Sequence, residues 1–133
     1  MTARSPRHVP CAGVPRLQEA QRPRVVVTSP QVCVETDGAD GARLRFDFDI
    51  YQAVRVRSID LYMPRGPEFV PYTVVEVEHS RWIEELRADL AQVDATADFL
   101  DRSHHWTLHA GDDVVEVVAW TMTWAPIDSP AAR

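Results

Sequence analysis

Three histidines and three carboxylates lie close together in the last third of the sequence. They are His104, His105, His109, Asp112, Asp113 and Glu116. Imidazole and carboxylate groups are ligands that zinc prefers. In a β-strand, however, His104 and His105 point to opposite faces, and His105 lies about 13 Å from His109. We therefore expect His105 and His109 to be solvent-facing sheet residues. A metal or small-molecule site at His105, His109 and Glu116 is the alternative.

Other catalytic signatures are absent from the sequence. Glu76 and Glu116 have apolar neighbours, and a buried glutamate can act as a general acid or base, but we expect both on the solvent face of a strand. There is no P-loop, no dinucleotide-binding glycine motif, no H-E-x-x-H and no G-x-S-x-G. The sequence predicts no catalytic residues and no cofactor. Hydrolysis at the His105, His109 and Glu116 face stays an alternative.

An apolar stripe follows at alternate positions and consists of Val118, Trp120, Met122 and Trp124. In a strand these side chains share one face. One interpretation is that they pack beneath a loop or beneath the segment containing Phe99 and Leu100. The other is that they form a surface for a protein partner or a second copy, because Trp and Met are enriched at interfaces.

The clearest periodicity in the chain predicts a helix over Arg81–Val93. Ser80 is a good N-cap residue, and Glu84 and Glu85 lie near the positive end of the helix dipole. The apolar stripe has helical spacing and consists of Trp82, Ile83, Leu86, Leu90 and Val93. A helix of this kind buries its stripe against a sheet.

A β-hairpin over His104–Trp124 follows this helix. Gly111 and Asp112 form its two-residue loop, because glycine suits the first position of a type II′ turn. The pairs on one face, where we expect the helix to pack, are Trp106 with Val117 and Leu108 with Val115. The pairs on the opposite face are His105 with Val118, Thr107 with Glu116, and His109 with Val114.

Strand-forming runs precede the helix. Pro30 separates Arg24–Ser29 from Gln31–Glu35, which indicates an edge strand or two short strands. Tyr72–Glu78 is the strand that leads into the helix. Ala95–Ser103 is predicted to hold a short helical turn.

The strictest alternation of apolar and charged residues is in Arg43–Ile50, which predicts a half-buried strand. We expect this run to form a hairpin with Val54–Arg57. Its outer pairs are then Asp49 with Arg55 and Asp47 with Arg57, both of opposite charge.

The 133 residues suit one domain, which we expect over residues 24–125. Residues 1–23, rich in Pro and Arg, are predicted to be a flexible tail, and residues 126–133 a second tail. The net charge of −6 disfavours a specific nucleic-acid partner. No stretch approaches the roughly 20 apolar residues of a membrane span, and no signal peptide is evident. We therefore expect a cytoplasmic protein with Cys11 and Cys33 as thiols, one disulfide being the alternative.

Three segments resemble a group of small bacterial proteins: Val75–Leu86, His105–Leu108 and Val115–Ala119. That group shares a V-x-E-V-x-x-S-x-W turn from strand to helix, an H-aromatic strand and an E-V-[IV]-A strand. The resemblance covers residues 74–121, under half of the chain. It implies that Ser80 is a structural cap and Trp82 a core contact of the helix, and it implies no site residues.

Together these observations predict an α+β fold, with an antiparallel sheet of five to seven strands and one main helix packed on one face. By analogy of class with immunity, antitoxin-like or accessory proteins, the leading hypothesis is a non-enzymatic protein-binding module of a bacterial cytoplasm. Val118, Trp120, Met122 and Trp124 are the predicted interaction surface, for a protein partner or a homodimer.

Overall fold

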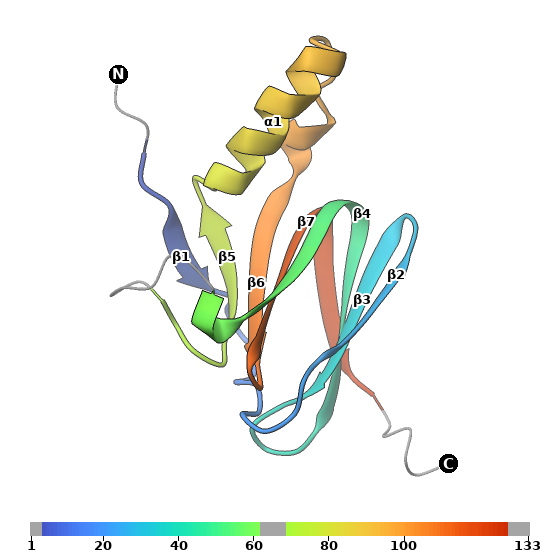
Figure 1. Ribbon diagram of the computed structural model, residues 1–133. Coiled ribbons are helices and arrows are strands. Elements are labelled where there is room, and N and C mark those ends of the chain that lie inside the picture. The colour runs from blue at the N-terminus through green and yellow to red at the C-terminus, as the bar shows by residue number, and fades with distance from the viewer. Residues whose placement is uncertain (1–3, 62–68, 128–133) are drawn as a thin grey trace.

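The computed structural model describes residues 4–61 and 69–127. Its elements, in chain order, are β1 (Arg7–Pro10), β2 (Arg24–Thr28), β3 (Gln31–Asp37), β4 (Arg43–Ser58), a 3-10 helix (Ile59–Leu61), β5 (Val74–Glu78), α1 (Arg81–Val93), a second 3-10 helix (Phe99–Arg102), β6 (His104–Ala110) and β7 (Asp113–Pro126). The strands form one antiparallel sheet in the order β1-β5-β6-β7-β4-β3-β2 (Figure 1). The predicted α+β fold with one main helix is confirmed.

The main core lies on one face of this sheet. Strands β3 to β7 all contribute to it, with one further residue from the N-terminal segment: Leu17, Val32, Val34, Leu44, Phe46, Phe48, Val74, Trp106, Leu108, Ala110, Val115, Val117 and Ala119. Phe48 of β4 and Trp106 of β6 have ring centroids 5.6 Å apart, although β7 lies between their strands. The sheet is therefore curved around this main core, and apolar burial of this kind dominates the stability of the fold.

Helix α1 packs on the opposite face of the sheet, next to β6. Its smaller apolar cluster contains Ile83, Leu100 and Val118, with Ala53, Trp82, Leu86 and Leu90 packed against it. The prediction that the helix packs on the Trp106–Leu108 face is wrong, because the curved sheet has already filled that face with side chains from β3 and β4. Val93, predicted to be part of the stripe, is 87% exposed.

The β6–β7 hairpin has the predicted register, including Trp106 opposite Val117 and Thr107 opposite Glu116. Gly111 takes a φ of 55° in the loop, and a Cβ there would lie 2.5 Å from the backbone oxygen of Gln21. Glycine is therefore required by both conformation and space. The bounds of α1 and the Ser80 cap are also confirmed, since Ser80 Oγ accepts the Ile83 N–H at 3.1 Å.

Strand β4 corrects the hairpin predicted over Arg43–Arg57. It runs unbroken for 16 residues and pairs with the long β7, with a shift of register between Tyr51 and Ala53. No turn forms at Tyr51–Ala53, where the sequence has no glycine. The strand continues through these residues and stays paired with β7. Arg55 and Arg57 consequently lie beside β7 and not opposite Asp49 and Asp47.

A flexible tail was predicted for residues 1–23, and over residues 4–23, the part of it that the structure describes, this prediction is wrong. Arg7–Pro10 forms β1 and pairs with β5, and Leu17 is 1% exposed within the main core. At the other end, β7 continues to Pro126, which pairs with Leu44, while residues 128–133 of the predicted C-terminal tail lie outside the described residues. Cys11 and Cys33 are free thiols, as expected. Within the described ranges, no helix has the length and apolar character needed to span a membrane.

Candidate functional site

His105 and Glu116 lie on the same face of the hairpin as helix α1, and both are buried. Their exposed fractions are 5% for His105 and 1% for Glu116. The prediction that His105 and His109 face solvent is wrong, as is the expected solvent position of Glu116. The physical reason differs from residue to residue. Trp82 of α1 contacts the His105 ring, and the arginines of β4 bind Glu116. Tyr72, just before β5, stacks on His109.

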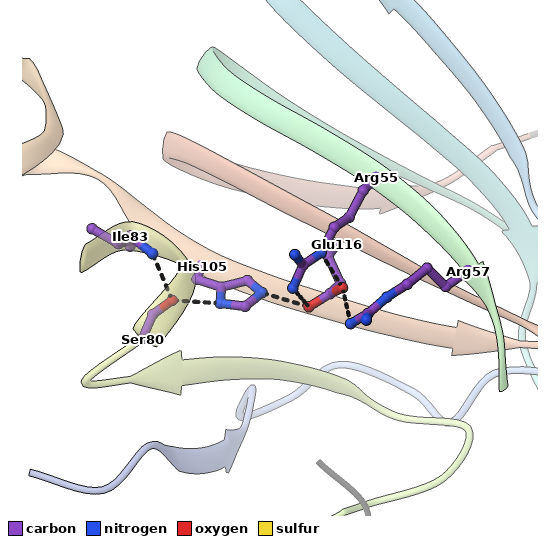
Figure 2. Close-up of polar contacts among 6 residues, drawn as sticks. All are labelled: Arg55, Arg57, Ser80, Ile83, His105 and Glu116. Carbon is purple, nitrogen blue, oxygen red and sulfur yellow. Dashed lines mark hydrogen bonds and ion pairs between the residues drawn. The ribbon is translucent and has the colours of Figure 1, made fainter. Parts of the chain in front are cut away.

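These two residues form a continuous hydrogen-bonded relay with Ser80. Ser80 Oγ lies 2.7 Å from His105 Nδ1, and His105 Nε2 lies 2.9 Å from Glu116 Oε1 (Figure 2). The residues come from three elements: the turn between β5 and α1, then β6, then β7. We call this set the Ser80–His105–Glu116 relay.

Two arginines of β4 hold the carboxylate end of the relay, as Figure 2 shows. Arg55 binds Glu116 through two hydrogen bonds, of 2.6 Å and 3.2 Å, and Arg57 binds it at 2.8 Å. Burial raises the pKa of Glu116, but the hydrogen bonds from His105 and Arg55 outweigh burial and lower that pKa from 4.5 to about 2. Glu116 is therefore ionised at neutral pH.

The ionised carboxylate determines where the protons of the relay lie. A carboxylate only accepts hydrogen bonds. His105 Nε2 therefore carries a proton, and its N–H donates a hydrogen bond to Glu116. Burial lowers the pKa of His105, so the imidazole is neutral and Nδ1 has a free lone pair. Ser80 O–H donates to that lone pair. The hydrogen bonds therefore run from Ser80 to His105 and from His105 to Glu116. A serine nucleophile with a histidine base requires these donor and acceptor roles.

Ser80 follows a strained residue at the start of α1. His79 has a φ of 55°, in the left-handed region, and non-glycine residues held there often occur at functional sites. Ser80 Oγ accepts one hydrogen bond from Ile83 N–H and donates one to His105. A hydroxyl oxygen has two lone pairs, so Ser80 retains one for another contact.

An open cleft of about 310 Å³ lies beside Ser80 and His105. Its walls come from β5, the first turns of α1, and the start of β6: Glu76, Val77, Glu78, His79, Ser80, Ile83, Glu84, Arg87, Ser103, His104 and His105. His104 Nδ1 and Glu76 Oε2 are 2.9 Å apart at its rim. The cleft is polar, and it carries more carboxylates than cations.

Trp82 encloses the inner side of the relay. Its ring meets the His105 ring edge to face, with centroids 5.2 Å apart, and the Arg55 guanidinium lies 3.9 Å from the Trp82 ring centroid. This arginine therefore binds both the aromatic ring and Glu116. The result is a fixed ring position for His105.

His109 belongs to a different contact group. Its Nδ1 accepts the Tyr72 N–H at 3.0 Å, and its ring stacks on Tyr72 with centroids 4.3 Å apart. The structure thus brings His105 and Glu116 together without His109. Over residues 4–61 and 69–127, no group of three or more His, Cys, Asp or Glu side chains is arranged to hold a metal ion.

The predicted apolar surface on β7 does not form a single stripe. Val118 is fully buried in the cluster beneath α1, whereas Met122 and Trp124 pack against the main core. Trp120 is partly buried, and its Nε1 donates to Phe99 O at 3.0 Å. The first interpretation, packing beneath the Phe99–Leu100 segment, therefore describes Val118 and Trp120. Whether any of these residues binds a partner stays a prediction.

His105 and Glu116 are predicted from the sequence as residues able to do chemistry, but three members of the site are not: Ser80 in a role beyond its cap, Arg55 and Arg57. One signal was present, since the predicted register made His105 and Glu116 diagonal neighbours on one face. The same register gives no signal for the two arginines, because the predicted hairpin pairs Arg55 and Arg57 with Asp49 and Asp47.

No family model, no curated protein and no solved structure matches this chain. The resemblance to small bacterial proteins accordingly stays a prediction. The pattern that carried it includes Ser80, Trp82, His105 and Glu116, and these four residues lie in one contact network.

Proposed function

We propose that the protein is a hydrolase or acyl-transfer enzyme in which Ser80 is the nucleophile and His105 the general base. Glu116 orients the imidazole and stabilises its protonated form. The observation that carries this proposal is the unbroken relay from Ser80 O–H to an ionised carboxylate, with Ser80 on the wall of a cleft. An adjacent base of this kind is what makes a serine hydroxyl reactive.

The proposed chemistry follows from the positions of the protons. Ser80 Oγ attacks a carbonyl carbon, its proton moves to His105 Nδ1, and the carbonyl oxygen becomes an oxyanion. As the intermediate collapses, His105 returns the proton to the leaving group, and an acyl group stays on Ser80. Water then releases this acyl group by the same steps in reverse order.

The first turn of α1 supports stabilisation of the oxyanion. Helical N–H groups in the first turn lack partners within the helix, and those of Arg81 and Trp82 follow Ser80 directly. The Ile83 N–H is already bound to Ser80 Oγ. Backbone donors and the positive end of a helix dipole are the groups that commonly bind such an oxyanion.

The charge of the cleft indicates the class of substrate. Glu76, Glu78 and Glu84 line it, against one arginine, Arg87. These carboxylates repel phosphate and carboxylate groups at short range. We therefore propose a neutral or cationic ester or amide as the substrate.

The test is esterase activity of the full chain on a neutral nitrophenyl ester. General base catalysis contributes about 100-fold or more, so Ser80→Ala should lower kcat/KM by at least about that factor. Ser103→Ala is the matched control, because Ser103 lines the same cleft without joining the relay, and it should keep its activity. Ser80→Asn retains a helix cap and should be inactive although folded. Equal rates for wild type, Ser80→Ala and Ser80→Asn would refute the proposal.

A protein-binding module is the second candidate function, favoured by the partial exposure of Trp120 and Trp124 on β7. In this case the protein acts in a bacterial cytoplasm, which the two free thiols support. The expected result is a stoichiometric partner that co-purifies with wild type and is lost with Trp120→Ala. A partner retained by Trp120→Ala would contradict this use of β7.

A further inference from the structure

Strand β2 is an outer edge of the sheet with an apolar sequence. Its five residues, Arg-Val-Val-Val-Thr, pair with β3 on one side only, and Val26 and Val27 are 37% and 47% exposed. Among the described residues, no backbone hydrogen bond reaches its outer side. An edge strand with unpaired N–H and C=O groups can pair with another strand.

The two edges of the sheet differ in how well they are protected. The other edge, β1, has four residues, one of which is Pro10, which cannot donate to a ladder. Prolines precede both strands, Pro6 before β1 and Pro23 before β2, but within its five residues β2 contains no proline. The charge of Arg24 is balanced within the chain, since its Nη1 lies 3.6 Å from Glu35 Oε1. No unbalanced charge therefore repels a strand that approaches β2.

We propose that β2 pairs antiparallel with β2 of a second copy, forming a dimer with one continuous sheet. With Val26 on the two-fold axis, Val25 lies opposite Val27 of the partner, and Arg24 lies opposite Thr28. Every central pair is valine against valine, and no like charges face each other. Pairing of identical edges closes after two copies, whereas β1-to-β2 pairing would extend without limit.

The arrangement of the fold keeps this dimer independent of the Ser80 cleft. β2 is the last strand at one side of the sheet, and α1 lies next to β5 and β6 (Figure 1). A second copy on β2 thus leaves the cleft open. The proposed dimer and the proposed enzymatic activity can therefore be tested independently, and either can be wrong without the other.

The experiment is the mass of the full chain in solution by light scattering. Wild type should have the mass of two chains. Val26→Asp should have the mass of one chain, because it would place two carboxylates opposite each other on the two-fold axis. Val93→Asp is the matched control, because Val93 is exposed on α1, which packs next to β6, and three strands separate β6 from β2 in the sheet. Val93→Asp and Trp120→Ala should both remain dimers. A monomeric wild type, or a dimer that survives Val26→Asp, would overturn the proposal.

A second measurement holds even where Val26→Asp unfolds. Cysteine at position 26 meets its own copy on the axis, at a Cβ separation of about 4.5–5.5 Å, close to the range that a disulfide spans. The variant needs Cys11→Ala and Cys33→Ala as background, because Cys33 lies opposite Val26 within the chain. Oxidation should cross-link Val26→Cys into covalent dimers and leave Thr28→Cys as single chains. Equal cross-linking of both variants, or none of either, would contradict the register.

Discussion

The two faces of the β6–β7 hairpin are both buried, but they meet different partners. On one face, Trp106 and Leu108 join the main core of the curved sheet. On the other, His105 and Glu116 lie between helix α1 and the arginines of β4. Apolar burial requires mainly that volume be filled, whereas a buried charge requires that each polar atom be matched. The first face therefore stabilises the fold, and the second fixes a precise geometry of ionisable groups.

The largest effect is expected on the apolar face. Phe48→Ala removes a fully buried ring that contacts Trp106, and it should lower the free energy of unfolding by about 3–5 kcal/mol. Phe99→Ala is the control, because Phe99 is 38% exposed, and its loss should be much smaller. Denaturant unfolding measures both. Similar losses for the two variants would contradict the assignment of the core.

A smaller loss is expected from the polar face. Glu116→Gln removes the charge that Arg55 and His105 stabilise, and the shift of its pKa to about 2 corresponds to about 3 kcal/mol of stability at neutral pH. Glu85→Gln on the exposed side of α1 should change stability by only a few tenths of a kcal/mol. If Glu116→Gln were as stable as wild type, the carboxylate would not be held ionised by its neighbours.

The pH dependence separates the two faces further. The folded pKa of His105 lies below its ordinary 6.5, so the unfolded chain takes up this proton first, and stability falls as the pH drops below 6.5. The folded pKa of Glu116 is also lowered, so its contribution is present above pH 4.5 and is lost as the pH falls toward 2. Between pH 6.5 and 4.5 the loss of stability therefore comes from histidine protonation, whereas the loss from Glu116 begins below pH 4.5.

Unfolding at several pH values measures this dependence. His105→Gln should reduce the fall between pH 6.5 and 4.5 and leave the part that His109 contributes, because burial lowers the pKa of His109 as well. The same change at the exposed His104 should leave the fall in place. The proposed activity should decline over the same acidic range, because a protonated His105 cannot accept the proton of Ser80. A stability that rises on acidification would contradict the assigned protonation states.

The smallest effect concerns Ser80 as a helix cap. Ser80→Ala should cost about 2 kcal/mol of stability, because it removes the cap and leaves the buried His105 Nδ1 without its donor. Ser80→Asn should cost less, because asparagine also caps helices. Thermal unfolding measures the difference. If both variants lost several kcal/mol, the hydroxyl would contribute to stability well beyond its cap.

Local signals in the sequence were sufficient for α1 and the β6–β7 hairpin, but not for β1, for the continuous β4 or for how the elements pack. The Ser80 cap and the loop at Gly111 depend on neighbouring residues, and both were predicted correctly. The face on which α1 packs depends on how β3 and β4 curve the sheet, which is a long-range property. The same holds for Leu17, whose place in the core is set by contacts with residues distant in sequence.

The candidate site shows the same division. His105 and Glu116 were identified as residues able to do chemistry, and the predicted register already made them neighbours. The burial of His105 and the role of Ser80 follow from the position of α1 over the hairpin, whereas the sequence indicated the opposite face for this helix. Glu116 is covered by the arginines of β4. Arg55 was missed because one continuous β4 replaces the predicted turn.

The most direct test of the central claim is covalent labelling of wild type with a fluorophosphonate, followed by peptide mapping by mass spectrometry. The relay predicts a single adduct on Ser80 at mildly alkaline pH, absent from a folded His105→Gln variant, while Ser103 in the same cleft stays unmodified. An unmodified Ser80 in the folded protein, or equal labelling in His105→Gln, would contradict the proposal and leave the relay as a purely structural support of α1.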